Sequence, residues 1–89
     1  MRPRVEWMTS ADNRLMEFLR DKEIVASPRV ISVNIDYDRQ YVSKRLQILA
    51  QNELVANVDT GLYEITDRGQ QYLDGEVEKE DLVPGKHEE

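Results

Sequence analysis

The segment SPRVISVNIDYDRQYVSKRLQILAQNEL, residues 27–54, predicts two consecutive helices joined by a tight turn. Ser27 can accept a hydrogen bond from the first free amides of a helix, and Pro28 suits the first helical position because its missing N–H would be unpaired there. The mostly apolar side of this helix is formed, at helical spacing, by Val30, Ile31, Asn34 and Ile35. The pattern stops at residue 36, and Asp38 then offers a cap for the second helix.

The second helix has an apolar side and a polar side. Val42, Leu46 and Leu49 recur at intervals of four and three residues, so we expect them to face inward. Another face is polar and basic, and it consists of Gln40, Ser43, Lys44 and Gln47. A helix fits the major groove, and Arg and Gln can bond bidentately to guanine and adenine edges, so these four side chains and Arg39 are candidate contacts to double-stranded DNA. The alternative is a solvated face, which most helices of soluble domains carry.

Three more residues of these helices are candidate DNA contacts. Arg29 lies near the start of the first helix, where the helix dipole favours an anion such as phosphate; the alternative is a solvated side chain. Tyr41 and Arg45 stand four residues apart, so Tyr41 could stack against a sugar and Arg45 could reach a phosphate. A Tyr41 packed under the helix, with Arg45 over its ring, fits the same spacing. The spacing alone leaves both arrangements open.

The next segment, LVANVDTGLYEIT from residue 54, predicts two short strands joined by a turn at residues 59–61. Gly61 suits this turn because it takes a positive φ without steric cost. Two helices followed by a hairpin is the order of a winged helix-turn-helix, in which the hairpin is the wing. Thr60, at the tip of the wing, is therefore a further candidate DNA contact.

Elements on either side complete the expected domain. Thr9 is a suitable cap for a helix that ends near residue 21 or 22, and the inward side of this helix consists of Ala11, Leu15, Phe18 and Leu19. Residues 24–26 suit a brief strand that pairs with the wing. Thr66 caps a last short helix that stops at Gly75.

Together these elements predict one α+β, mainly helical domain over residues 5–75, with three helices, a two-stranded wing and a short C-terminal helix. Residues 76–89 are charged and short of core residues, so we expect a disordered acidic tail. We also expect a homodimer, because two reading helices related by a two-fold axis bind a palindromic site better than one. The candidate interface is the first helix, the last helix and residues 7–8, which otherwise fold onto the core.

The formal net charge of −6 is unusual for a DNA-binding protein, since a basic surface is the usual electrostatic feature. Its distribution is more informative. Residues 27–47 carry four basic and two acidic side chains, whereas residues 48–89 carry three basic and eleven acidic ones. The two predicted helices are therefore the net-positive part of an acidic chain. A surplus of carboxylates is also typical of proteins adapted to concentrated salt; the alternative is a plain acidic surface that keeps the protein in solution.

The composition argues against catalysis. The single histidine, His87, lies in the acidic tail, so there is no catalytic triad and no His-carboxylate set with metal-ligand spacing. There is no cysteine and no Gly-rich phosphate loop, so we expect neither an enzyme nor a bound cofactor or metal. No apolar run reaches the length of a membrane span, and residues 1–10 lack a signal-peptide core, which predicts a cytoplasmic protein without membrane contact. A single small domain also leaves little room for a small-molecule effector.

Three runs of the chain also share a pattern with a known family: Trp7-Met8-Thr9, SPRVISVNIDYDRQYVSKRL from residue 27, and VDTGLYEITDRG from residue 58. Over about residues 5–75 the sequence resembles the small winged-helix regulators of halophilic archaea, the halophage phi-H repressor-like family. This resemblance implies a cytoplasmic DNA-binding transcription regulator, such as a repressor, with the helix at about residues 38–51 in the major groove. It also implies a salt-adapted acidic surface.

Two acidic residues depart from the pattern of such families. Asp59 precedes Thr60 in the wing, where related wings often have a basic residue before the glycine, and Asp38 stands where Ser or Thr is common. An acidic wing repels phosphate, so contacts from the wing are less expected than contacts from the helix. The acidic surface also keeps a second function open, that of a winged helix that binds another protein without binding DNA.

Overall fold

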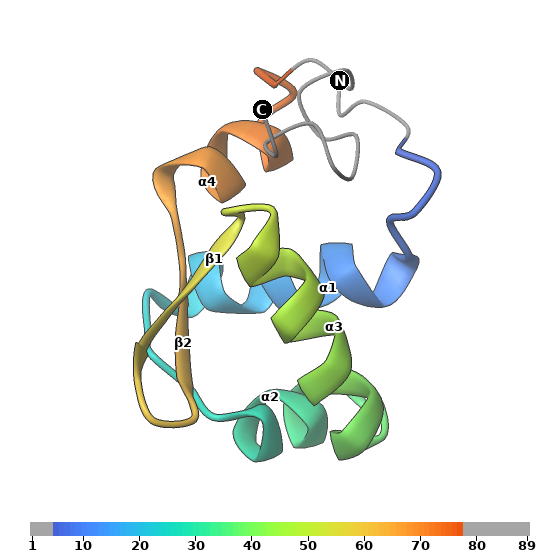
Figure 1. The fold of residues 1–89 in the computed structure, drawn as a ribbon, viewed down its shortest axis with the longest axis vertical. Helices are drawn as coiled ribbons and strands as arrows, with labels where there is room; N and C mark the ends of the chain where they lie inside the picture. Colours follow the sequence, from blue (N-terminus) through green and yellow to red (C-terminus); the bar gives the residue numbers. More distant parts are fainter. Residues whose placement is uncertain (1–4, 78–89) are drawn as a thin grey trace.

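Four helices and a two-stranded antiparallel sheet make up residues 5–77, the part of the chain that the computed structural model describes. In chain order the elements are α1 (Ser10–Lys22), α2 (Pro28–Ile35), α3 (Arg39–Gln51), β1 (Val55–Asp59), β2 (Leu62–Ile65) and α4 (Asp67–Leu73). Helices α1, α2 and α3 pack against one another, and the hairpin of β1 and β2, the wing, projects beside them (Figure 1). The predicted α+β winged helix-turn-helix is thereby confirmed. Most of the predicted acidic tail, from residue 78 on, lies outside the described residues.

Each of the first three helices begins at a residue whose side chain caps its first turn. The Thr9 hydroxyl accepts a hydrogen bond from the Asp12 amide, and the Asp12 carboxylate accepts one from the Thr9 amide. Ser27 caps α2, and Asp38 caps α3 by accepting from two amides of the first turn. The predicted starts of α1, α2 and α3 are therefore confirmed.

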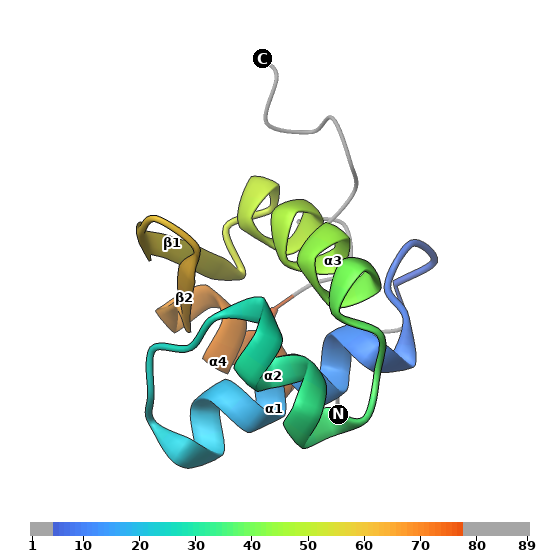
Figure 2. The same cartoon turned by 90° about the horizontal axis from the view of Figure 1, so that it is seen from below.

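The turn between α2 and α3 is short because α2 ends on a residue in the left-handed region. Asp36 has a φ of 64°, and its amide donates to the carbonyl of Ser32 at 2.9 Å. Asp is one of the few residue types other than glycine that visits this conformation readily. The chain therefore reverses within two residues, and Asp38 starts α3 at a steep angle to α2 (Figure 2).

The core is formed by one side of each helix. Its fully buried helical residues include Leu15, Met16 and Leu19 of α1, Ile31 and Ile35 of α2, and Val42, Leu46 and Leu49 of α3. The predicted inward side of α3 is confirmed. On α1 the predicted Ala11, Leu15 and Leu19 are buried together with Met16, while Phe18 is only half-buried, at the edge of the core.

Two residues of the predicted mostly apolar side of α2, Val30 and Asn34, are exposed. Val30 is 44% exposed, so its expected inward position is wrong. The helix turns its other flank, which carries Ser32, toward the core. Ser32 tolerates burial because its hydroxyl donates to the carbonyl of Arg29 at 2.8 Å, which leaves no polar atom of the side chain unsatisfied.

The wing is an antiparallel pair whose base joins the helical core. Val55 pairs with Ile65 and Asn57 with Tyr63, and the register becomes irregular between residues 57 and 59, next to the turn. Tyr63 is buried, and Ile65 packs against the core at its edge, as the alternation along the strand predicts. The predicted strand at residues 24–26 is present as one bridge, in which Ala26 and Tyr63 exchange two backbone hydrogen bonds of 2.9 Å.

Helix α4 closes the domain at the end away from the wing turn (Figure 1). The hydroxyl of Thr66 caps it by accepting from the Gly69 amide at 3.0 Å, and the same hydroxyl donates to the Glu53 carbonyl at 2.7 Å. The predicted cap of this helix is confirmed, and Tyr72 and Leu73 anchor the helix in the core. At the other end of the described chain, residues 7–8 fold onto the core, which is one of the two arrangements that their sequence allowed.

Candidate nucleic-acid interface

Helix α3 lies on the outer side of the three-helix unit. Seen along the long axis of the molecule, α3 and α1 occupy opposite sides, and the wing stands beside α3 (Figure 2). Gln40, Lys44 and Gln47 are exposed and Ser43 is half-buried, so these four residues form the polar face of α3. Gln51 continues this face by one more turn and is also exposed. Gln51 was not among the predicted contacts, although its spacing of four residues from Gln47 places it on the same face of the helix.

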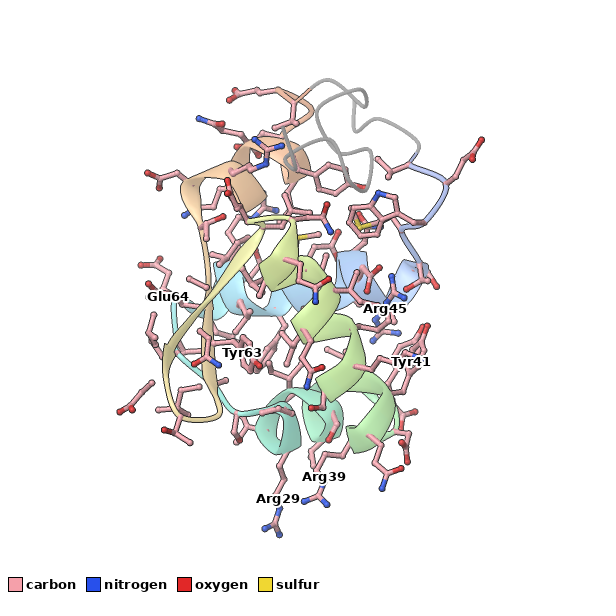
Figure 3. All side chains as sticks on the ribbon, viewed as in Figure 1. Arg29, Arg39, Tyr41, Arg45, Tyr63 and Glu64 are labelled. Atoms are coloured by element: carbon pink, nitrogen blue, oxygen red, sulfur yellow. The ribbon has the colours of Figure 1, made fainter. Side chains whose placement is uncertain are left out.

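A groove separates the start of α3 from the start of α2. Its lining consists of Ser27, Pro28 and Arg29 on one side and Arg39, Gln40 and Ser43 on the other. Arg29 and Arg39 line this groove together, and their side chains point away from the body of the protein (Figure 3). Within residues 5–77 neither forms an ion pair. Two candidate residues from separate helices are thus brought to one site, where both can meet an anion.

Arg45 was a candidate phosphate contact, but its guanidinium group binds within the protein. Its Nε donates to Asp12 Oδ1 at 2.8 Å, and its Nη2 donates to Asp12 Oδ2 at 2.6 Å and to the carbonyl of Trp7 at 2.9 Å. Asp12 is fully buried. The hydrogen bond to Asp12 raises the pKa of Arg45 above its usual value, against the opposing effect of burial. A guanidinium held in this way has no free fork for a phosphate.

Tyr41 is 39% exposed at the side of α3, and it packs against another tyrosine and not against Arg45. Its ring lies 6.1 Å from the ring of Tyr37, with an angle of 25° between the two planes. The cation over a tyrosine ring is Arg14 of α1, whose guanidinium carbon lies 5.9 Å from the centre of the Tyr37 ring. The pairing of Arg45 with the Tyr41 ring, one of the two arrangements that the spacing allowed, is therefore not formed, since Asp12 holds Arg45 elsewhere.

The tip of the wing is exposed and acidic. Thr60, the candidate contact at this tip, donates its backbone amide to the Asp59 carboxylate at 2.7 Å. The Asp59 carboxylate places a negative charge at the turn, and Glu64 adds another on the exposed side of β2 (Figure 3). Residues 55–65 contain no basic side chain to offset these two. The wing is thus electrostatically unlike the surface beside Arg29 and Arg39.

Within residues 5–77, no cluster of three or more His, Cys, Asp or Glu side chains has the arrangement of a metal site. None of the helices described here has both the length and the apolar character needed to cross a membrane.

Three packed helices, a wing hairpin and a polar, outward face on the third helix define a winged helix-turn-helix protein. The chain belongs to the winged helix-turn-helix phage repressor family, whose family model matches residues 1–84. This is a family of repressors, and not of enzymes.

The chain is also similar to two particular proteins. The repressor protein of Halobacterium phage phiH is 31% identical over 86 residues, which span 92% of this chain and 97% of the phage protein. The crystal structure of the PhiH1 repressor-like protein from Haloarcula marismortui superposes with a TM-score of 0.73 and 35% sequence identity, covering 84% of this chain and 86% of that one. Both relatives come from a halophile or its phage, as the resemblance read from the sequence implies.

Proposed function

We propose that this protein is a cytoplasmic transcription repressor that binds double-stranded DNA at a specific sequence, with α3 in the major groove. The observation that carries this proposal is the polar face of α3, flanked by the two exposed guanidinium groups of Arg29 and Arg39. The printed name of the phage relative, a repressor protein, supports it. We place the DNA-binding unit in residues 5–75, and its action needs no small-molecule effector.

The side chains of the polar face have the chemistry of base readers. The amides of Gln40 and Gln47 can each bond to N6 and N7 of adenine, and Arg39 can bond to O6 and N7 of guanine. Lys44, between the two glutamines, can reach either a guanine or a phosphate. Arg29 lies across the groove from Arg39 and is placed for the phosphate that flanks the bases.

The acidic residue at the start of α3 is compatible with this role because its charge is used locally. The Asp38 carboxylate accepts hydrogen bonds from the amides of Gln40 and Tyr41, at 3.0 and 3.2 Å. A carboxylate at a helix N-terminus is also stabilised by the helix dipole. In concentrated salt the repulsion between the acidic surface and phosphate is further weakened, since the Debye length falls to about 3 Å at 1 M.

A homodimer on a palindromic operator follows from the same proposal, since one helix of this length reads only a few base pairs. The spacing of the two half-sites would then report the separation of the two α3 helices.

A protein-binding module is the alternative function, and one feature favours it. Val33, on the outward side of α2, is 75% exposed, and Val30 beside it is 44% exposed. Exposed apolar side chains mark protein interfaces when they form part of a contiguous patch. The alternative predicts binding through α2 without any contribution from the polar face of α3.

The first test is selection of bound duplexes from a randomised pool, followed by sequencing, at low and at multimolar potassium chloride. We expect enrichment of a palindrome by the unsubstituted protein and its loss in Arg39→Ala, because this substitution removes a base-reading guanidinium. Lys22→Ala is the matched control, since it also removes one exposed positive charge but lies at the far end of α1. Absence of enrichment at both salt concentrations, with the protein folded, would contradict the proposal and favour the protein-binding module.

A further inference from the structure

A row of three side chains runs along the flank of α3 that faces away from the groove of Arg29 and Arg39. It consists of Tyr41 on α3, Tyr37 in the turn before α3, and Arg14 on α1. The two rings stack with their centres 6.1 Å apart. The guanidinium carbon of Arg14 lies 5.9 Å from the centre of the Tyr37 ring. The ring of Tyr37 therefore places Arg14 beside the turn that leads into α3.

Arg14 has the properties of a cation that is available to an external anion. The residue is exposed, and within residues 5–77 it takes part in no ion pair. The arginines of α1 and α3 that do form ion pairs, Arg20 and Arg45, are only partly exposed. Contact with a ring face orders a guanidinium without using its N–H donors, so the fork of Arg14 stays free.

The geometry of α3 relates this row to the proposed DNA interface. Successive residues of a helix are about 100° apart, so Arg39 and Tyr41 lie on the two opposite sides of Gln40. On one side, Arg39 lines the groove together with Arg29. On the other side, Tyr41 stacks with Tyr37, whose ring is contacted by Arg14. A helix in the major groove lies between the two sugar–phosphate backbones that border the groove. The two sides of α3 therefore each present a cation to one of these backbones.

We propose that Arg14, positioned by the ring of Tyr37, binds a backbone phosphate of duplex DNA on the strand opposite to the one contacted by Arg29. This inference rests on the proposed function, and it adds α1 to the DNA-binding surface. Tyr41 supports the contact because its ring stacks with the Tyr37 ring, 6.1 Å between centres. The contact is to phosphate, so it adds affinity without reading the sequence.

The test is the affinity of the full chain for its selected duplex, measured by fluorescence anisotropy over a range of potassium chloride concentrations. Arg14→Ala is expected to bind roughly fivefold more weakly, and by the same factor for the selected duplex and for a duplex with one changed base pair. The slope of log affinity against log salt should become less negative by about 0.9, the value for one lost phosphate contact. Arg14→Lys, which keeps the charge, should retain the slope of the unsubstituted protein.

Lys22→Ala is again the matched control, because it removes one exposed charge from the same helix. Alanine has the highest helix propensity and Arg14 is exposed, so the variant keeps its fold, which circular dichroism can confirm. If Arg14→Ala behaves like Lys22→Ala while Arg39→Ala loses binding, this inference is wrong and the proposed function stands. If the unsubstituted chain binds no duplex, both are wrong.

Discussion

Substitution of Arg45 by methionine is expected to lower the free energy of unfolding by about 3 kcal/mol. Methionine keeps much of the length of the side chain but leaves the buried carboxylate of Asp12 without the two hydrogen bonds that Arg45 donates at 2.8 and 2.6 Å. An uncompensated buried charge is among the most destabilising defects that a single substitution can cause. The loss lies at the lower end of the range for broken buried ion pairs because the Arg45 side chain retains 12% exposure. Urea denaturation at 25 °C, monitored by circular dichroism, measures the loss.

The matched control is Arg20→Met, the same change at a surface ion pair. Arg20 bridges to Asp21 at 3.4 Å and to Asp74 at 3.1 Å, with its side chain 29% exposed. Exposed pairs of this type contribute less than about 1 kcal/mol, and salt screens them further. We therefore expect a small loss at low salt that shrinks at high salt, against a large loss at both for Arg45→Met. Equal effects of the two substitutions would show that the Arg45 pair is not a buried, stabilising one.

The second large effect is expected for Gly69→Ala, in the first turns of α4. A Cβ at this position would overlap the carbonyl oxygen of Leu54 and lie 2.8 Å from Cγ1 of Ile65. Alanine is normally the better helix former by about 1 kcal/mol, so at an open helical site the same change stabilises. Here α4 must move off the base of the wing, because the overlapped atom belongs to the backbone. We expect a net loss of about 2 kcal/mol in thermal or urea unfolding.

Gly61→Ala separates this packing effect from backbone strain. Gly61 has a φ of 71°, and a Cβ there would meet no atom within 4 Å. The cost is then only that of an L-residue in the left-handed region, about 1 kcal/mol. A Gly69→Ala variant that is as stable as the unsubstituted protein would contradict the tight packing of α4 against residue 54.

The Arg45 pair also matters for the proposed function. It joins the first turn of α1 to the middle of α3, and its bond to the Trp7 carbonyl brings in the chain before α1. The bonds lie on the flank of α3 next to the core and involve no residue of the polar face, so the polar face is free while the helix is held. A buried pair is screened little by salt, which suits a protein whose relatives come from saline environments.

Much of the fold could be predicted because the signals for it are local. Thr9, Ser27, Asp38 and Thr66 each cap a helix through atoms at most three residues away, so their role is visible in a short stretch of sequence. The inward side of α3 was also predictable, because its thirteen residues repeat the apolar pattern more than once. Helix α2 has eight residues, too few for the apolar pattern to show whether Val30 or Ser32 faces the core.

The contacts that could not be predicted join residues far apart in the chain. Asp12 and Arg45 are 33 residues apart, and their meeting depends on how α1 crosses α3. Arg45 lies on α3 between the core and the polar face, so its spacing fits a phosphate, a ring or a carboxylate equally well. The contact of Arg14 with Tyr37 likewise depends on the course of the turn after α2. Charge and periodicity in the sequence therefore indicated the polar face of α3. The packing of α1 determines that Arg45 is paired with Asp12 and that Arg14 stays available to an external anion.

The position of DNA on the protein can be observed residue by residue with the isotopically labelled full chain, titrated with the selected duplex and followed by amide chemical shifts. We predict that the largest shifts fall within residues 39–47 and at residues 29–30, and that they vanish in the same titration of Arg39→Ala. Shifts confined to α4 or to the outward side of α2, with residues 39–47 unchanged, would contradict the assignment of α3 as the DNA-reading helix.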